Sequence, residues 1–149
     1  MKKQFLIATS LAIAAVMLGS LTLGNANEEA QGRPFTVAMS GGEEAPGPGD
    51  PDGTGVATFT MNPGLGEIQF TLRVENIGPA TAAHIHRAPA GVPGPIVVPL
   101  TAPTSGSSSG TVTASRELIL EILKNPSQFY VNVHNAEFPG GAVRGQLSR

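Results

Sequence analysis

The chain has 149 residues, with nine basic and eleven acidic side chains, three histidines and no cysteine. A chain of this length is expected to form one domain. The lack of cysteine excludes disulfide bonds and thiolate metal ligands, so stability has to come from a hydrophobic core. The slightly acidic charge balance argues against nucleic acids and anionic membranes as partners.

The first 26 residues have the pattern of a secretory signal. A short basic start precedes an uncharged apolar run from Phe5 to Leu18, which is short for a membrane span. Small residues at Gly24 and Ala26 then predict cleavage after Ala26 and a mature chain that begins at Asn27. An uncleaved N-terminal anchor is the alternative.

Cleavage at this point removes two lysines and no acid, which leaves seven basic against eleven acidic residues and a net charge of −4. We therefore predict a signal peptide over 1–26, a flexible leader over 27–33 and one domain over 34–149. The expected location is secreted or periplasmic, with no membrane contact after cleavage.

Alternation of apolar and polar residues predicts β-strands from residue 35 onward. Phe35 to Met39 alternates with period two and ends at a Gly/Pro-rich loop over 41–53. Two further strands, Ala57 to Met61 and Glu67 to Glu75, are separated by a Pro-Gly turn, which is typical of a hairpin.

The second half of the chain continues in the same way, with one interruption by a helix. Ser115 is placed to cap a short helix over 116–124, whose apolar residues lie on one side. The other expected segments are a strand over 81–87, a Gly/Pro loop over 87–95, a strand over 96–100, a Ser/Gly-rich connection over 101–110, and strands over 111–114, 129–134 and 143–147. Many short strands with Gly/Pro turns predict an all-β fold, an antiparallel β-sandwich or flattened Greek-key barrel with one short helix.

The three histidines lie on two of these strands and share one side of them. In the segment Thr81–Arg87 (TAAHIHR), Ala83 and Ile85 point to the core, so His84 and His86 point together to the other face. His134 likewise lies opposite the apolar row of its own strand, on the same face as Tyr130 and Asn132. If the two strands are neighbours, three imidazoles converge from one sheet face, which predicts a three-histidine metal site. The alternative is that these are solvated histidines or members of a hydrogen-bond network.

Arg144 shares this face if the last two strands form a hairpin. A fixed cation beside a metal ion would attract small anions, which makes Arg144 a candidate catalytic residue. The alternative is a surface ion pair between Arg144 and Glu137.

Four stretches together resemble a CHRD domain, a module repeated in the animal protein chordin and found singly in secreted microbial proteins. They are FTVAMSGGEEAP, LRVENI, TAAHIHRAPAGVPGPIV and FYVNVHNAEFPGGAVRGQL, and the match covers nearly all of the mature chain. For the microbial members the resemblance implies an extracellular or periplasmic β domain and no settled activity.

A weaker resemblance links the histidine pattern to copper/zinc superoxide dismutase. That family is a β-sandwich in which an H-x-H strand, a later V-x-H segment and a following arginine surround copper, and His84, His86, His134 and Arg144 match this order. The chain has no fourth histidine to bridge two metals, no histidines for a zinc site and no disulfide cysteines. The resemblance therefore implies at most a copper-only centre.

Three classes of function remain open from the sequence. The first is a metal-binding protein that holds copper, with zinc as the other possible ion; copper is preferred because it ranks above zinc for nitrogen ligands. The second is a copper-only redox enzyme of the dismutase type, with Arg144 as the anion-attracting residue. The third is an extracellular interaction module in which the histidines only brace loops. The missing bridging histidine and the acidic net charge favour binding over catalysis.

Overall fold

In the computed structural model, residues 34–148 form eight β-strands and one α-helix; the predicted signal and leader lie outside these described residues. The strands are β1 (Phe35–Ser40), β2 (Thr54–Asn62), β3 (Glu67–Glu75), β4 (Ala80–Arg87), β5 (Ile96–Leu100), β6 (Ser107–Thr113), β7 (Phe129–Asn135) and β8 (Val143–Gln146). The helix is α2 (Arg116–Lys124), and two short 3-10 helices are η1 (Gly41–Glu43) and η2 (Pro126–Gln128).

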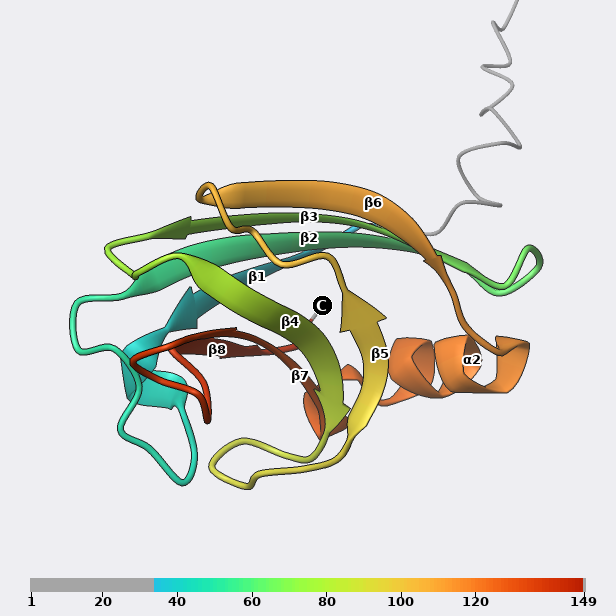
Figure 1. The fold of residues 1–149 in the computed structure, drawn as a ribbon. Coiled ribbons are helices and arrows are strands. Elements are labelled where there is room, and N and C mark those ends of the chain that lie inside the picture. Colours follow the sequence, from blue (N-terminus) through green and yellow to red (C-terminus); the bar gives the residue numbers. More distant parts are fainter. Residues whose placement is uncertain (1–33, 149) are drawn as a thin grey trace, which may run out of the picture.

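All eight strands belong to one antiparallel sheet with the order β5-β4-β7-β8-β1-β2-β3-β6. The sheet curls so that its edge strands β5 and β6 approach each other, and the result is a nearly closed barrel. In Figure 1 the strands β1, β2, β3 and β6 form one side of this barrel, and β4, β5, β7 and β8 form the other. The predicted all-β fold with one short helix is confirmed.

The barrel interior is filled by the apolar residues that the alternation predicted. Strand β3 shows this most clearly, because Ile68, Phe70, Leu72 and Val74 are all buried while the residues between them are exposed. On the opposite side of the barrel, Ala83 and Ile85 of β4 and Val131 and Val133 of β7 enter the same core. The histidines on these two strands therefore project away from the interior.

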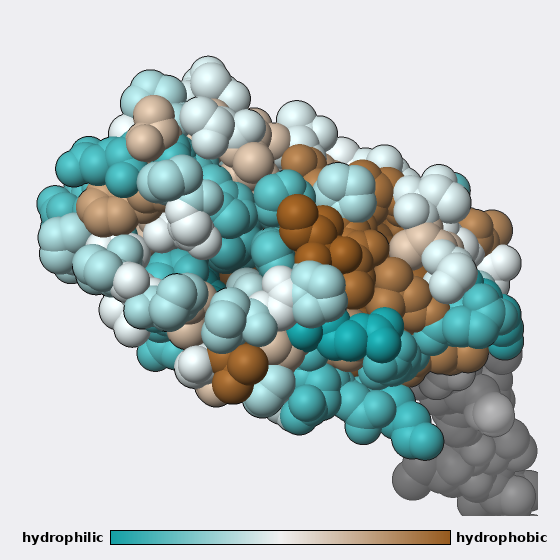
Figure 2. All heavy atoms as spheres, turned by 60° about the horizontal axis from the view of Figure 1, so that its bottom comes forward, coloured by the Kyte–Doolittle hydropathy of each residue, from teal (hydrophilic) through white to brown (hydrophobic). Residues whose placement is uncertain are grey.

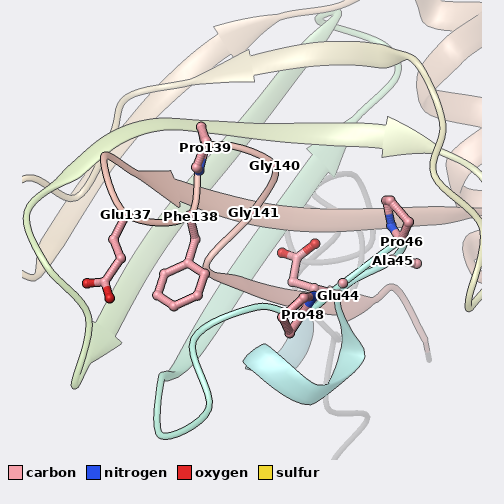
Figure 3. Close-up of a pocket in the computed structure, with 10 residues that line it drawn as sticks. Glu44, Ala45, Pro46, Pro48, Glu137, Phe138, Pro139, Gly140 and Gly141 are labelled. Atoms are coloured by element: carbon pink, nitrogen blue, oxygen red, sulfur yellow. The ribbon is translucent and has the colours of Figure 1, made fainter.

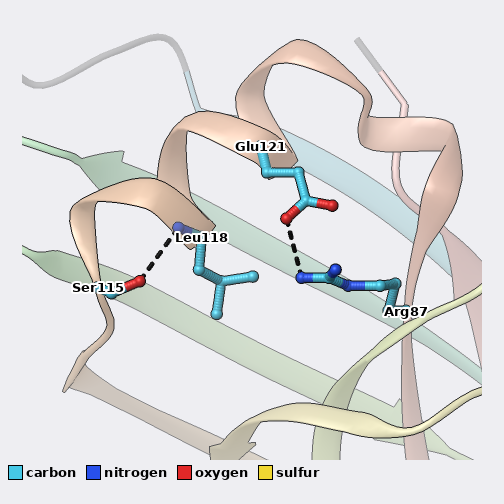
Figure 4. A network of polar contacts seen from close by, with 4 residues as sticks. All are labelled: Arg87, Ser115, Leu118 and Glu121. Atoms are coloured by element: carbon cyan, nitrogen blue, oxygen red, sulfur yellow. Dashed lines mark hydrogen bonds and ion pairs between the residues drawn. The ribbon is translucent and has the colours of Figure 1, made fainter.

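Helix α2 begins where the sequence predicted it. The hydroxyl oxygen of Ser115 accepts a hydrogen bond from the amide of Leu118, at 3.2 Å, which satisfies one of the free donors of the first turn (Figure 4). Ile119 and Ile122 are fully buried against the barrel. Outside, Arg87 at the end of β4 forms an exposed ion pair with Glu121, at 2.8 Å (Figure 4).

The prediction for the segment before the helix is wrong in its bounds. We expected a connection over 101–110 and a strand from Thr111, but β6 already begins at Ser107. Strand β6 pairs with β3 along its whole length at the edge of the sheet, and most of its side chains are exposed or half-buried. Serines are sufficient there because the backbone makes the pairing and no apolar face is needed.

The described surface carries few large apolar side chains. Figure 2 shows one side of the molecule, largely hydrophilic, with a compact hydrophobic patch. No helix among residues 34–148 has the length and hydropathy required to cross a bilayer.

Candidate metal centre

Strands β4 and β7 are direct neighbours, as the metal-site hypothesis required. Their antiparallel register places Ala82 opposite His134, His84 opposite Asn132, and His86 opposite Tyr130. Because alternate residues of neighbouring strands share a face, all three imidazoles meet on the side of the sheet away from the core. One nitrogen from each of His84, His86 and His134 lies within 4.8 Å of the others.

The separations of these nitrogens fit one metal ion. With metal–nitrogen bonds of about 2.0–2.1 Å, two imidazole nitrogens on one ion lie roughly 3.3–3.6 Å apart. Nδ1 of His84 and Nε2 of His134 are already 3.2 Å apart. A small movement of the third ring is enough to complete the set.

Backbone carbonyls fix which nitrogen two of the rings present. Nδ1 of His86 donates to the carbonyl of Gly94 at 2.8 Å, and Nδ1 of His134 donates to the carbonyl of Pro139 at 2.9 Å. Both rings therefore direct the lone pair of Nε2 toward the centre, which is the usual second-sphere arrangement of metal-bound histidine. Nε2 of His86 is buried and has no hydrogen-bond partner among the described residues. A metal ion would supply the missing partner.

His84 presents its other nitrogen. Because Nε2 of His134 is an acceptor, the short contact with His84 is a hydrogen bond in which Nδ1 of His84 carries the proton. For Nδ1 of His84 to bind a metal ion, the proton would have to move to Nε2 of the same ring, which keeps the ring neutral.

The environment keeps all three histidines neutral. Burial is the main cause that lowers the pKa of His84 to about 4, and the neighbouring His134 and His86 contribute to the same shift. Burial is also the main cause that lowers the pKa of His86 and of His134. Only the neutral ring binds a metal, so the lowered pKa values suit a ligand set.

The face that carries the histidines is largely covered, so the alternative of fully solvated histidines does not apply. His84 and His134 are half-buried, but His86 is only 7% exposed, and Tyr130 and Asn132 are buried as well. Loop 88–95, between β4 and β5, covers this part of the sheet. The alternation of the strands gives the face of a residue but not what lies over that face.

Arg144 holds this covering loop in place. Its guanidinium donates to the carbonyls of Pro89 and Val92, at 2.9 and 3.0 Å. The same group lies 3.4 Å from the centre of the Tyr130 ring, and that ring stacks on His86 with an interplanar angle of 8°. His86 reaches Tyr130 from β4 and Arg144 reaches it from β8, so the tyrosine is packed between them.

The alternative of a surface ion pair between Arg144 and Glu137 is wrong. Arg144 does share the sheet face of the histidines, since β7 and β8 pair with Asn132 opposite Arg144. It is 1% exposed, however, and its guanidinium donates to two carbonyls of loop 88–95 and to Gln146. Its N–H groups donate to the protein itself and are not directed at an anion from solvent.

A groove of about 350 Å³ lies beside the centre, between loop 44–48 and loop 137–141 (Figure 3). Glu44 and the ring of Phe138 line it from opposite sides, and Pro139, whose carbonyl holds His134, belongs to the same wall. Burial raises the pKa of Glu44 to about 7, against the opposing effects of Arg144 and Asn132. No local pattern pointed to Glu44 as part of this region, because the groups that link its carboxyl to the centre, Arg144 and Asn132, are distant in the chain.

Comparison with known proteins identifies the family and nothing narrower. Searches of curated proteins and of solved structures found no match. The family model described as the CHRD domain matches residues 35–147, which is nearly the whole described domain. CHRD domains are typically extracellular modules, in keeping with the sequence resemblance. The chain belongs to the CHRD domain family.

Proposed function

We propose that this domain binds one copper ion through Nδ1 of His84 and Nε2 of His86 and His134. The observation that supports this most is the convergence of the three ring nitrogens within 4.8 Å. Two of the three rings are also oriented by backbone carbonyls, as metal-bound histidines usually are. A network of histidines that only braced loops would leave no reason for the unpartnered Nε2 of His86.

Copper is the proposed ion, with zinc as the competitor. All three donors are neutral imidazole nitrogens, which suit both metals, and the affinity order of divalent ions places copper above zinc. We further propose that the protein is exported through the N-terminal signal and holds copper in a secreted or periplasmic location.

Copper holding is favoured over dismutase-type catalysis because of Arg144. The anion-attracting role requires a guanidinium that is free to meet a small anion beside the metal. Arg144 is instead buried and directed at the carbonyls of Pro89 and Val92. The interaction-module alternative predicts no specific metal uptake at all.

Copper titration of the mature domain tests the proposal. The wild type should bind one copper per chain, and His84→Ala, His86→Ala and His134→Ala should each weaken binding at least a hundredfold. Gln69→Ala changes an exposed position on β3, on the opposite side of the barrel, and should bind as the wild type does. Equal copper uptake by the wild type and the triple histidine variant would refute the site.

A further inference from the structure

Asn132 lies in the middle of the three-histidine cluster and has no assigned role. It is opposite His84 in the β4–β7 register and two residues before His134, so its side chain shares their face. It is 2% exposed. Its Oδ1 is buried and has no hydrogen-bond partner among residues 34–148. Burying an amide oxygen without a hydrogen-bond partner or a bound cation costs free energy.

The unpartnered oxygen lies close to the unpartnered nitrogen of the same site. A contact with the Asn132 side chain favours the protonated form of His86, yet neither Oδ1 of Asn132 nor Nε2 of His86 has a partner at hydrogen-bond geometry among residues 34–148. In the neutral ring Nε2 has no hydrogen to donate, because the proton is on Nδ1, which donates to the carbonyl of Gly94. Two buried acceptor atoms on neighbouring strands are therefore left without a donor, and a cation bound by both would satisfy them.

Glu44 accounts for the orientation of the amide. Its carboxyl group also interacts with Asn132, and in Figure 3 it points toward Gly141, at the end of the β7–β8 loop. A side chain at Gly141 would meet the carboxyl oxygens of Glu44 at 2.3–2.4 Å, so only glycine allows this approach. The ionised form of Glu44, which the interaction with Asn132 favours, only accepts hydrogen bonds, so an amide that turns its NH₂ end to Glu44 directs Oδ1 to the histidines.

We propose that Asn132 is the fourth protein ligand of the centre, with Oδ1 as an oxygen donor and Glu44 as the residue that orients the amide. This inference rests on the proposed copper site and deepens it. It replaces an all-imidazole site by one with three nitrogens and one oxygen. Because Cu(I) prefers soft ligands and Cu(II) accepts oxygen, the added donor selects Cu(II).

Two substitutions at one position test the assignment in opposite directions. Asn132→Leu removes the oxygen and keeps a similar volume, and Asn132→Asp keeps the shape and replaces the amide oxygen by a charged one. Cu(II) and Cu(I) affinities are measured by competition with chelators of known affinity, together with the midpoint potential and the Cu(II) EPR spectrum.

For Asn132→Leu we expect Cu(II) binding at least tenfold weaker and Cu(I) binding changed less than about threefold. A tenfold fall in the ratio of Cu(II) affinity to Cu(I) affinity corresponds to a rise of about 59 mV in the midpoint potential. Asn132→Asp should shift the potential the other way, and its EPR spectrum should change while the couplings from three nitrogens remain. If Asn132→Leu does not fold, the isosteric Asp variant still decides the question.

The Cu(I) affinity is the internal control for a merely structural role. A packing defect would weaken the binding of Cu(I) and Cu(II) by the same factor. That result, or an unchanged potential and EPR spectrum in Asn132→Asp, would overturn the assignment of Asn132 but not the proposed copper site. Wild-type protein that binds no copper would overturn the proposed function and this inference together. The two failures are therefore distinguishable.

Discussion

Among single residues, His86 differs from the other two histidines because it is a part of the packed structure as well as a candidate ligand. Its ring stacks on Tyr130 with centroids 4.7 Å apart, and its Nδ1 holds the carbonyl of Gly94. His84 and His134 are more exposed. The same substitution should therefore have different structural costs at the three positions.

His86→Ala should destabilise the metal-free protein, whereas His84→Ala and His134→Ala should have small effects. The loss of a stacked ring and of a buried hydrogen bond amounts to about 1–3 kcal/mol. Urea denaturation of the metal-free variants measures the difference. Three equal changes in the free energy of unfolding would contradict the assigned burial.

The sequence was sufficient to find the three candidate ligands but not the groups around them. Alternation on three strands placed His84, His86, His134 and Arg144 on one face, and the structure has them there. The roles of Arg144 and Asn132 depend on loop carbonyls and on Glu44, which are distant in the chain. Periodicity within a strand contains no information on such contacts.

Among the elements, loop 88–95 has the largest influence on the site. Arg144 and Gln146 bind its carbonyls, and the amide of Gly94 donates to the hydroxyl of Tyr130 at 3.2 Å. A Cβ atom at Gly94 would meet the carbonyl oxygen of Arg87 at 2.0 Å. The loop can return this close to β4 only because residue 94 is glycine.

Gly94→Ala should therefore weaken copper binding and lower stability. The added methyl forces the loop away from β4 and removes the carbonyl that orients His86, at a cost of about 1–3 kcal/mol. Gly140→Ala is the matched control, since a Cβ atom there meets nothing within 4 Å. Copper titration and thermal melting measure both effects. An unchanged copper affinity in Gly94→Ala would show that the loop does not orient His86.

The predictable elements were those with a buried apolar row. Strand β3 and helix α2 were predicted at their observed bounds, because burial of one side imposes a period on the sequence. Strand β6 was predicted too short, since an edge strand of serines has no such period. Loop 88–95 contains Gly and Pro, which indicate that the chain turns there but not which face of the sheet the loop will cover.

For the whole molecule, the histidine environment sets the response to pH. The pKa of His84 is about 4 in the folded protein, against 6.5 when it is unperturbed. Between these values the unfolded chain binds a proton that the folded protein does not. The stability contributed by neutral His84 is thus complete above pH 6.5 and is lost as the pH falls toward 4.

Copper binding should persist at a lower pH than ordinary imidazoles allow. An unperturbed site would release copper below about pH 6, but protons compete for His84 only near pH 4. We expect less than a tenfold loss of affinity between pH 7 and pH 5. A peptide of residues 81–87 should lose roughly a hundredfold or more over the same range. Equal losses for protein and peptide would mean that the fold does not shift the pKa values.

Copper-loaded protein should show weak or no superoxide dismutation. The net charge of −4 expected after signal cleavage would repel anions, and Arg144 is occupied with loop carbonyls. Stopped-flow decay of superoxide, with free copper and Arg144→Ala as controls, measures the rate. A rate near the diffusional ceiling of ~10⁹ M⁻¹s⁻¹ that falls in Arg144→Ala would establish the enzyme instead.

The unequal burial of the three rings also implies an order for metal exchange. An ion arriving from solvent meets His84 and His134 first, because they are the more exposed pair and their nitrogens are already 3.2 Å apart. His86, beneath loop 88–95, closes the chelate last and is the ligand least accessible to a competing chelator. In the proposed copper site the outer pair would then set the rate of capture, and the buried ring with the loop above it would set the residence time.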